Sequence, residues 1–187
     1  MRRLLDGLYA ASGALAAAFV LAIAALVMAQ VTLNTVDRVS TLLTGTAIGL
    51  TIPSYSDFTG FFLAAASFLA LAHTLRRGDH IRVTLVTGRL PARARRAVEA
   101  AAVGVALVVT VLLAWYVGDL VLESHEYGDM SSGMVAVPIW IPQLFVAIGI
   151  ATLAVALADE LHGLLRGRSP SWEGAGEAAA APSGEAP

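Results

Sequence analysis

The side chains best suited to chemistry in this sequence are a few histidines and the acidic residues beside one of them. His125 lies among Glu123, Glu126 and Asp129, which are all oxygen or nitrogen donors for a divalent metal. Their spacing matches no known zinc motif, so solvated loop charges are the preferred interpretation.

Two other histidines raise the question of a haem. His73 and His162 fall near the same end of two apolar segments, where two axial ligands of a b-type haem could meet. Residues at a membrane interface are the simpler interpretation. Ser131 has no neighbouring base that would make it a nucleophile, and the chain has no cysteine. We therefore expect a protein that is not an enzyme and that binds no metal or cofactor of its own.

The elements that carry these residues are strongly apolar. Of 187 residues, 57% are hydrophobic and only 14% are charged, with a mean hydropathy of +0.74, whereas soluble domains have about 25% charged residues. A helix of roughly 20 apolar residues crosses a bilayer and satisfies its own backbone hydrogen bonds. The sequence predicts an all-α integral membrane protein with four transmembrane helices, at about 8–31, 58–75, 97–117 and 139–161.

Local signals refine these helices. Proline favours the first turn of a helix, so Pro91 and Pro142 indicate where the third and fourth regular helices begin. The segment 41–53 is apolar but too short to span, and forms either a short interfacial helix or a loop between spans one and two. A strip of small residues at i, i+4 spacing in span one predicts close helix packing: Ala10, Ala14, Ala18 and Ala22.

The arginines predict the orientation. The chain has twelve arginines and no lysine, and every arginine except Arg38 lies before span one, between spans two and three, or after span four. The positive-inside rule therefore places both termini in the cytoplasm. A formal net charge of −2 offers no basic field for nucleic acid. The first apolar run is longer than that of a signal peptide, so it is interpreted as a span.

Two regions follow from this composition. Residues 1–166 form one four-helix membrane domain, whereas residues 167–187 are rich in Gly, Ala, Pro, Ser and Glu and are expected to form a disordered cytoplasmic tail. The spans carry no ionisable residue near their middles. Because ion and proton pathways are usually marked by such residues, we expect that the chain does not conduct a substrate alone.

Two motifs add a family resemblance. Gly78 to Val83 (GDHIRV) follows the second span, and Pro138 to Gln143 (PIWIPQ) leads into the fourth. With the four-span layout, they resemble the small, DctQ-type membrane subunit of tripartite ATP-independent periplasmic (TRAP) transporters. The family-motif residues are Gly78, Asp79, His80, Arg82, Pro138, Trp140, Pro142 and Gln143. Thr84, where an acidic residue is expected, and Tyr55-Ser56-Asp57, in place of an acidic pair, depart from the pattern.

The resemblance implies a partnership in the bacterial inner membrane. A large multi-span membrane subunit would carry the substrate and sodium sites, and a periplasmic binding protein would deliver the solute, often one with a carboxylate. The small subunit would bind the large one and enlarge its static scaffold.

The resemblance also implies roles for single residues. His80 and Arg82 would lie in a cytoplasmic loop or at phospholipid headgroups. Trp140, Pro142 and Gln143 would fix the start of the fourth helix, with Gln143 able to form an interhelical hydrogen bond. The sequence leaves open whether Arg38 contacts the periplasmic partner or pairs with its neighbour Asp37.

Two alternatives from other classes stay open at this point. One is a self-sufficient small transporter that acts as a homo-oligomer, and the other is a membrane anchor subunit of a redox complex. Solute uptake by liposomes that contain only this chain would identify the first. A haem band in the absorbance spectrum would identify the second.

Overall fold

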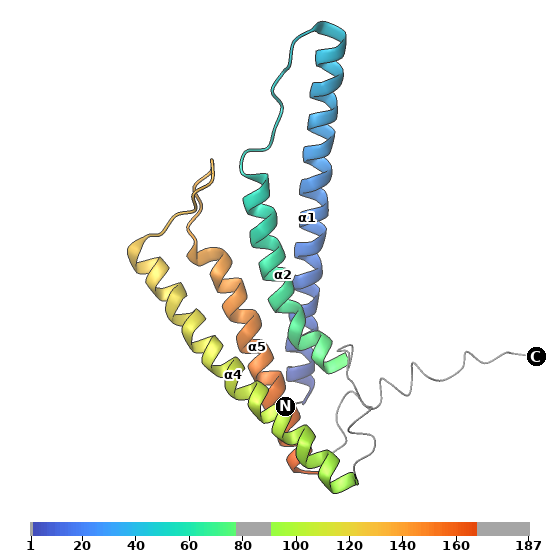
Figure 1. Ribbon diagram of the computed structural model, residues 1–187, viewed down its shortest axis with the longest axis vertical. Helices are drawn as coiled ribbons and strands as arrows, with labels where there is room; N and C mark the ends of the chain where they lie inside the picture. Colours follow the sequence, from blue (N-terminus) through green and yellow to red (C-terminus); the bar gives the residue numbers. More distant parts are fainter. Residues whose placement is uncertain (1, 78–90, 168–187) are drawn as a thin grey trace, which may run out of the picture.

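The computed structural model describes residues 2–77 and 91–167, which form four helices (Figure 1). These are α1 (Arg2–Thr44), α2 (Tyr55–Arg77), α4 (Ala92–Tyr127) and α5 (Trp140–Leu165). Each helix is long and apolar enough to cross a membrane. Within the described ranges, extended pairing is confined to one isolated bridge between Met130 and Pro138. The prediction of an all-helical chain with four such helices is confirmed.

The helices extend beyond the predicted spans because hydropathy marks the apolar part of a helix and not its ends. α1 continues to Thr44 and α4 to Tyr127. α5 begins at Trp140, two residues before the predicted start at Pro142. Proline is accommodated there because N–H groups in the first turn have no acceptor within the helix. α4 begins at Ala92, with Pro91 as its N-cap in place of its predicted first residue.

The segment 41–53 forms no helix of its own. Its first four residues are the last turn of α1, and the chain from 45 to 52 is irregular. Gly45 and Gly49 both have positive φ, 74° and 77°. Glycine adopts this conformation without steric cost, which allows the chain to reverse at this point.

The four helices lie side by side in the order α1, α2, α5, α4 (Figure 1). α2 and α5 are the inner helices, and α1 and α4 are the edges of the row. We call the end that holds the start of α1 and the ends of α2 and α5 the Arg76 end, after a residue described below. The opposite end, with the 45–54 and 128–139 connections, is the loop end.

Small residues let the inner helices approach closely. At Gly149 of α5, an added Cβ atom would lie 2.7 Å from the carbonyl oxygen of Phe68 on α2. Two clusters of buried apolar residues hold the row together. The one at the Arg76 end contains Tyr9, Ala72, Leu75, Val103, Ala156, Leu157 and Leu164. The other contains Ala16, Ala65 and Leu69, with Phe19, Ala70 and Phe145 packed against it.

The alanine strip predicted in α1 does not pack against the other described helices. Ala10, Ala14 and Ala18 are exposed and Ala22 is half-buried. The packed face instead carries Tyr9, Ser12 and Ala16. Ser12 donates a hydrogen bond to the Leu69 carbonyl oxygen over 2.6 Å. This bond satisfies the Ser12 hydroxyl within the row and lies on the face of α1 that packs against α2.

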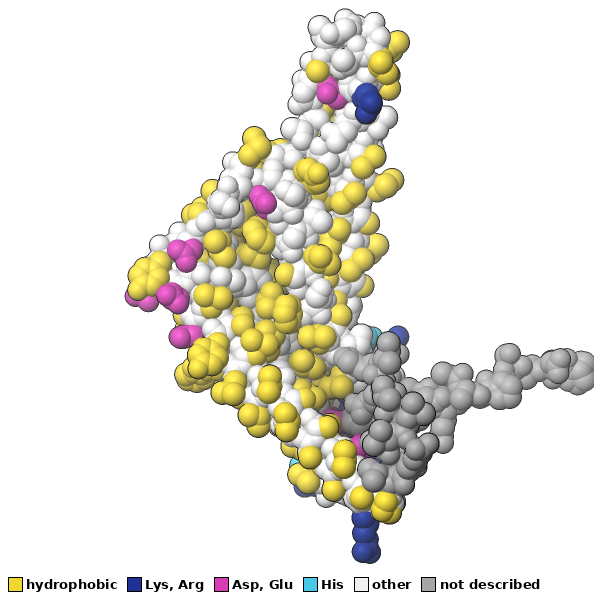
Figure 2. All heavy atoms as spheres, viewed as in Figure 1, with side chains coloured by type: hydrophobic (Ala, Val, Ile, Leu, Met, Phe, Trp, Pro, Cys, Tyr) yellow, Lys and Arg dark blue, Asp and Glu magenta, His cyan; other side chains and the backbone are white. Residues whose placement is uncertain are grey.

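Much apolar surface remains uncovered by this chain alone. Figure 2 shows hydrophobic side chains spread over the visible face of α4 and of its neighbours, with acidic side chains gathered toward the loop end of α4. Large exposed residues on α4 include Val105, Val109, Leu112, Trp115 and Tyr116. Such a surface requires lipid or a membrane-embedded partner.

Candidate functional site

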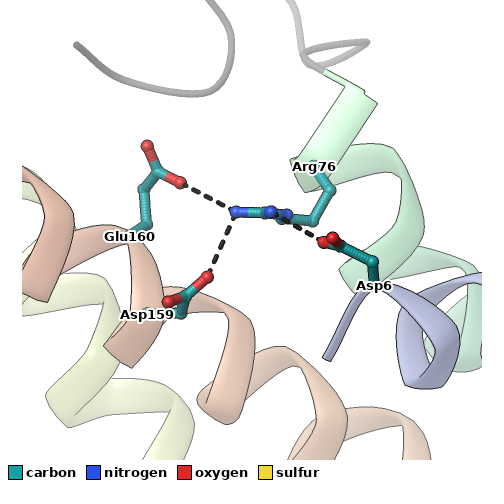
Figure 3. Close-up of polar contacts among 4 residues, drawn as sticks. All are labelled: Asp6, Arg76, Asp159 and Glu160. Atoms are coloured by element: carbon teal, nitrogen blue, oxygen red, sulfur yellow. Dashed lines mark hydrogen bonds and ion pairs between the residues drawn. The ribbon is translucent and has the colours of Figure 1, made fainter. Parts of the chain in front are cut away.

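An arginine at the end of α2 joins three helices (Figure 3). Its guanidinium lies 3.0 Å from Asp6 of α1, 3.2 Å from Asp159 of α5 and 3.7 Å from Glu160 of α5. We call these four residues the Arg76 cluster. The side chain of Arg76 is 17% exposed and that of Glu160 only 6%. Charged groups this poorly solvated are stable only when paired.

The topology of the row brings these charges together. Asp6 precedes the apolar part of α1, Arg76 is in the last turn of α2, and Asp159 lies near the end of α5. α1 and α2 run in opposite directions, as do α2 and α5, so all three positions lie at one end. A cation in the last turn of α2 also interacts favourably with the helix dipole.

The aromatic ring of Tyr9 packs against the guanidinium of Arg76. The guanidinium carbon of Arg76 lies 5.5 Å from the centre of the Tyr9 ring, a cation–π distance. Tyr9 is 2% exposed and packs into the apolar cluster at the Arg76 end. Arg76 is thus held by carboxylates on α1 and α5 and by the ring of Tyr9. This arrangement is suited to holding α1, α2 and α5 in one geometry.

The loop end is held by different chemistry. Ser54, with a φ of 56°, accepts a hydrogen bond at Oγ from the backbone N–H of Val135, over 2.9 Å. A Cβ atom at Gly133 would overlap the carboxylate of Asp57, so the 128–139 connection lies directly against the first turn of α2. These contacts join α2 to the α4–α5 connection without an ion pair between described residues.

Two polar side chains of α1 fasten the 45–54 connection. Gln30, only 4% exposed, accepts a hydrogen bond from the Ile52 N–H and donates to Thr51 Oγ1. About two turns further along, Asp37 Oδ1 accepts hydrogen bonds from the backbone N–H groups of Ile48 and Gly49, over 2.7 and 2.8 Å. The connection therefore runs back along α1.

The second family motif lies at the start of α5. Pro138 precedes the helix, Trp140 is its first residue, and Pro142 lies in its first turn. The Trp140 ring packs edge to face on His125 of α4, with 5.1 Å between ring centres. The expected interhelical hydrogen bond of Gln143 is not formed in the described chain, where its buried Oε1 has no partner. Among the described residues Gln143 therefore does not bridge two helices.

The first family motif, Gly78 to Val83, lies outside the residues that the structure describes. Gly78, Asp79, His80 and Arg82 all lie between residues 77 and 91, beyond the described residues. The same holds for the expected tail after residue 167.

Arg38 and its neighbour Asp37 have different surroundings. Asp37 binds backbone N–H groups, whereas Arg38 is exposed on the last turns of α1. Among residues 2–77 and 91–167, no ion pair joins Arg38 to a carboxylate. Within these residues Arg38 and Asp37 therefore do not form an ion pair, and a contact of Arg38 with the periplasmic partner stays a prediction.

The two histidines considered as haem ligands and the serine considered as a nucleophile do not lie in one common site. His73 packs against Gly13 of α1, where an added Cβ atom would lie 2.7 Å from the imidazole Cγ, whereas His162 is exposed. Ser131 Oγ is hydrogen-bonded within its own connection, to Val135 and Val137. In the part of the chain that the structure describes, no group of three or more metal-ligating side chains is arranged to hold an ion.

A comparison with protein families agrees with this architecture. A family model described as "Tripartite ATP-independent periplasmic transporters, DctQ component" matches residues 46–167, from the first connection to the end of α5. The chain belongs to this family. The match excludes most of α1 and therefore leaves the longest helix to be interpreted from the structure. No curated protein matches the chain.

Membership makes the chain a small permease subunit of a TRAP transporter. The DctQ family is a transporter component and is not known as a catalytic family. In general it functions with a large TRAP membrane subunit and a periplasmic binding protein. The Arg76 cluster was missed by sequence reasoning, although Asp6 and Arg76 flank predicted spans and Asp159 lies near the end of another, all on one side.

Proposed function

We propose that this chain is a non-catalytic brace for the large membrane subunit of a TRAP transporter. In this role it supports the sodium-coupled import of a solute, an organic acid, that a periplasmic binding protein delivers. Its place is the bacterial inner membrane with both termini in the cytoplasm, which the distribution of arginines supports. Sodium and substrate would bind in the large subunit.

The single-row arrangement carries this proposal. Four helices side by side, one helix thick, enclose no passage between them. Among the described residues, Glu160 is the one charged residue classed as buried, and it lies at the Arg76 end and not in mid-span. A chain that moved ions by itself would need polar groups within the membrane. The row instead offers broad apolar faces to a partner.

The edge helices α1 and α4 leave most of their apolar surface exposed in this chain. In the most apolar part of α1 and of α4, only 11% of the residues are buried, compared with 28% in α2 and α5. Helices packed against another subunit would bury this surface with close van der Waals contact. We infer that the large subunit covers part of it and that phospholipid covers the rest.

Reconstitution tests the proposal. Co-expression with the large subunit should give a stable complex, and uptake by proteoliposomes should require both chains, the binding protein and a sodium gradient. If this chain stays separate from the large subunit in the same membranes, the proposal fails. Uptake by liposomes that contain this chain alone would favour a self-sufficient homo-oligomeric transporter, and a haem band would favour a redox anchor.

The first family motif provides a further test. Arg82→Ala should lower the yield of the complex with the large subunit, because we assign this residue to a cytoplasmic loop or a headgroup contact and not to substrate. Transport by the complex that does form should keep its KM. A change confined to the KM for solute would contradict this role. The yield is measured by quantitative co-purification, with Arg77→Ala as the matched control.

A further inference from the structure

The helices extend to different distances from the Arg76 cluster. Measured from the Arg76 cluster at 1.5 Å per residue, α2 reaches about 32 Å to Tyr55 and α5 about 29 Å to Trp140. Both lengths match a hydrocarbon core of about 30 Å. α1 reaches a similar level, about 36 Å, at Gln30.

α1 then continues past this level. Val31 to Thr44 add about 21 Å of helix, and Figure 1 shows this part of α1 standing beyond the ends of the other helices. We call residues 31–52 the α1 tip. It contains the charged residues Asp37 and Arg38, whereas no charged residue lies between Asp6 and Asp37. From its length and charges we expect the α1 tip to extend past the hydrocarbon core into the aqueous layer.

The tip is held in place by its own hydrogen bonds. Gln30 fixes Thr51 and Ile52, and Asp37 fixes Ile48 and Gly49. The helical threonines also bond within the helix, each hydroxyl donating to the carbonyl oxygen four residues earlier: Thr32, Thr35, Thr41 and Thr44. These polar groups thus form their hydrogen bonds within this chain and need no partner protein.

Among exposed threonines, the tip also exposes several large apolar side chains and one cation. Leu42 and Leu43 are each 80% exposed and Ile48 is 59% exposed, joined by Val36 and Val39. Arg38 is exposed among them, and within the described residues no carboxylate pairs with it. Large apolar side chains clustered in water mark a protein interface, and arginine is common at such interfaces.

We propose that the α1 tip is a docking site for the solute-binding protein of the transporter. The partner places a carboxylate opposite Arg38 and apolar side chains over Leu42, Leu43 and Ile48. A soluble protein is favoured because the tip extends beyond every other described element at the loop end, into the layer that a soluble protein reaches first. This inference rests on the proposed function and adds a named contact surface to it.

The test uses the complete complex of both membrane subunits in nanodiscs, titrated with the purified, solute-loaded binding protein. Arg38→Glu and the double variant Leu42→Ser/Leu43→Ser should each weaken binding by about tenfold or more. Leu4→Ser is the matched control for the apolar change, because Leu4 is 78% exposed at the opposite end of α1. Arg166→Glu is the control for the charge.

The outcomes separate the two proposals. Unchanged binding by both tip variants in an intact complex would overturn the docking site and leave the brace function standing. Loss of the large subunit from the tip variants would overturn it too, by showing that the large subunit covers the tip. Absence of any complex for the unsubstituted chain would instead refute the brace function. A photo-crosslinker at Leu43 should join this chain to the binding protein.

Discussion

The two ends of the bundle are held together by different forces. At the Arg76 end, one guanidinium contacts carboxylates on α1 and α5. At the loop end, Gln30, Asp37 and Ser54 bind backbone N–H groups of connections. The first set of contacts joins helices directly, whereas the second fastens loops to helices. Charge substitutions should therefore disturb the helix row only at the Arg76 end.

The largest effect is expected at the centre of the cluster. Arg76→Ala removes the cation shared by three carboxylates and should lower the free energy of unfolding by about 3 kcal/mol. The adjacent Arg77→Ala is the matched control, because Arg77 is exposed, and should change it little. Unfolding by SDS in mixed micelles gives both values. Equal effects of the two substitutions would show that the cluster adds no stability.

A substitution midway between the ends tests the packing that both ends share. Gly149→Ala should cost about 2 kcal/mol, because its Cβ would press on the backbone of α2 at Phe68. Gly104→Ala on α4 meets no atom within 4 Å and should be neutral or slightly stabilising. The same SDS titration compares them. A neutral Gly149→Ala would mean that α2 and α5 are further apart than described.

The loop end should respond locally. Gln30→Ala leaves the Ile52 N–H and Thr51 hydroxyl without this partner and should cost about 1.5 kcal/mol. Hydrogen exchange at the Ile52 amide should become faster, while amides in α5 keep their rates. Thr35→Ala, which removes a hydroxyl bonded within α1, is the control. Faster exchange throughout α5 would contradict the separation of the two ends.

The smallest effect distinguishes two carboxylates of the Arg76 cluster. Asp6 is 53% exposed and Asp159 is 26% exposed, so salt screens the first more strongly. Asp6→Asn should cost about 0.5 kcal/mol and should reduce the dependence of the melting temperature on NaCl. Asp159→Asn should cost more. The reverse order would show that burial does not rank these pairs.

The sequence predicts which residues lie at each end better than it predicts what they touch. Asp6, Arg76 and Asp159 each flank an apolar segment, and alternating helix direction then puts them at one level. Hydropathy does not fix the rotation of a helix about its axis, however, and the alanine strip of α1 does not predict the face that packs within this chain. Ser12, whose hydroxyl needs an acceptor, was the better signal.

The loop end was less predictable for a physical reason. Its contacts depend on backbone N–H groups that only become available where the chain leaves a helix, as at Gly49 and Val135. Gly45 and Gly49 permit the chain to reverse after α1, but no side-chain pattern in residues 41–53 predicts which N–H groups it presents to α1. Gln143 shows the same limit, because a glutamine before a span suggested a hydrogen bond across helices, and its buried oxygen has none in the described chain.

The Arg76 cluster also has a consequence for how the chain is made. Asp6 lies 70 residues before Arg76 in the sequence, and Asp159 lies 83 residues after it. During synthesis, a hairpin of α1 and α2 can therefore form only the ion pair between Asp6 and Arg76. The other two carboxylates become available only when α5 has been made, so Arg76 cannot gain its full set of partners until the last helix is in place.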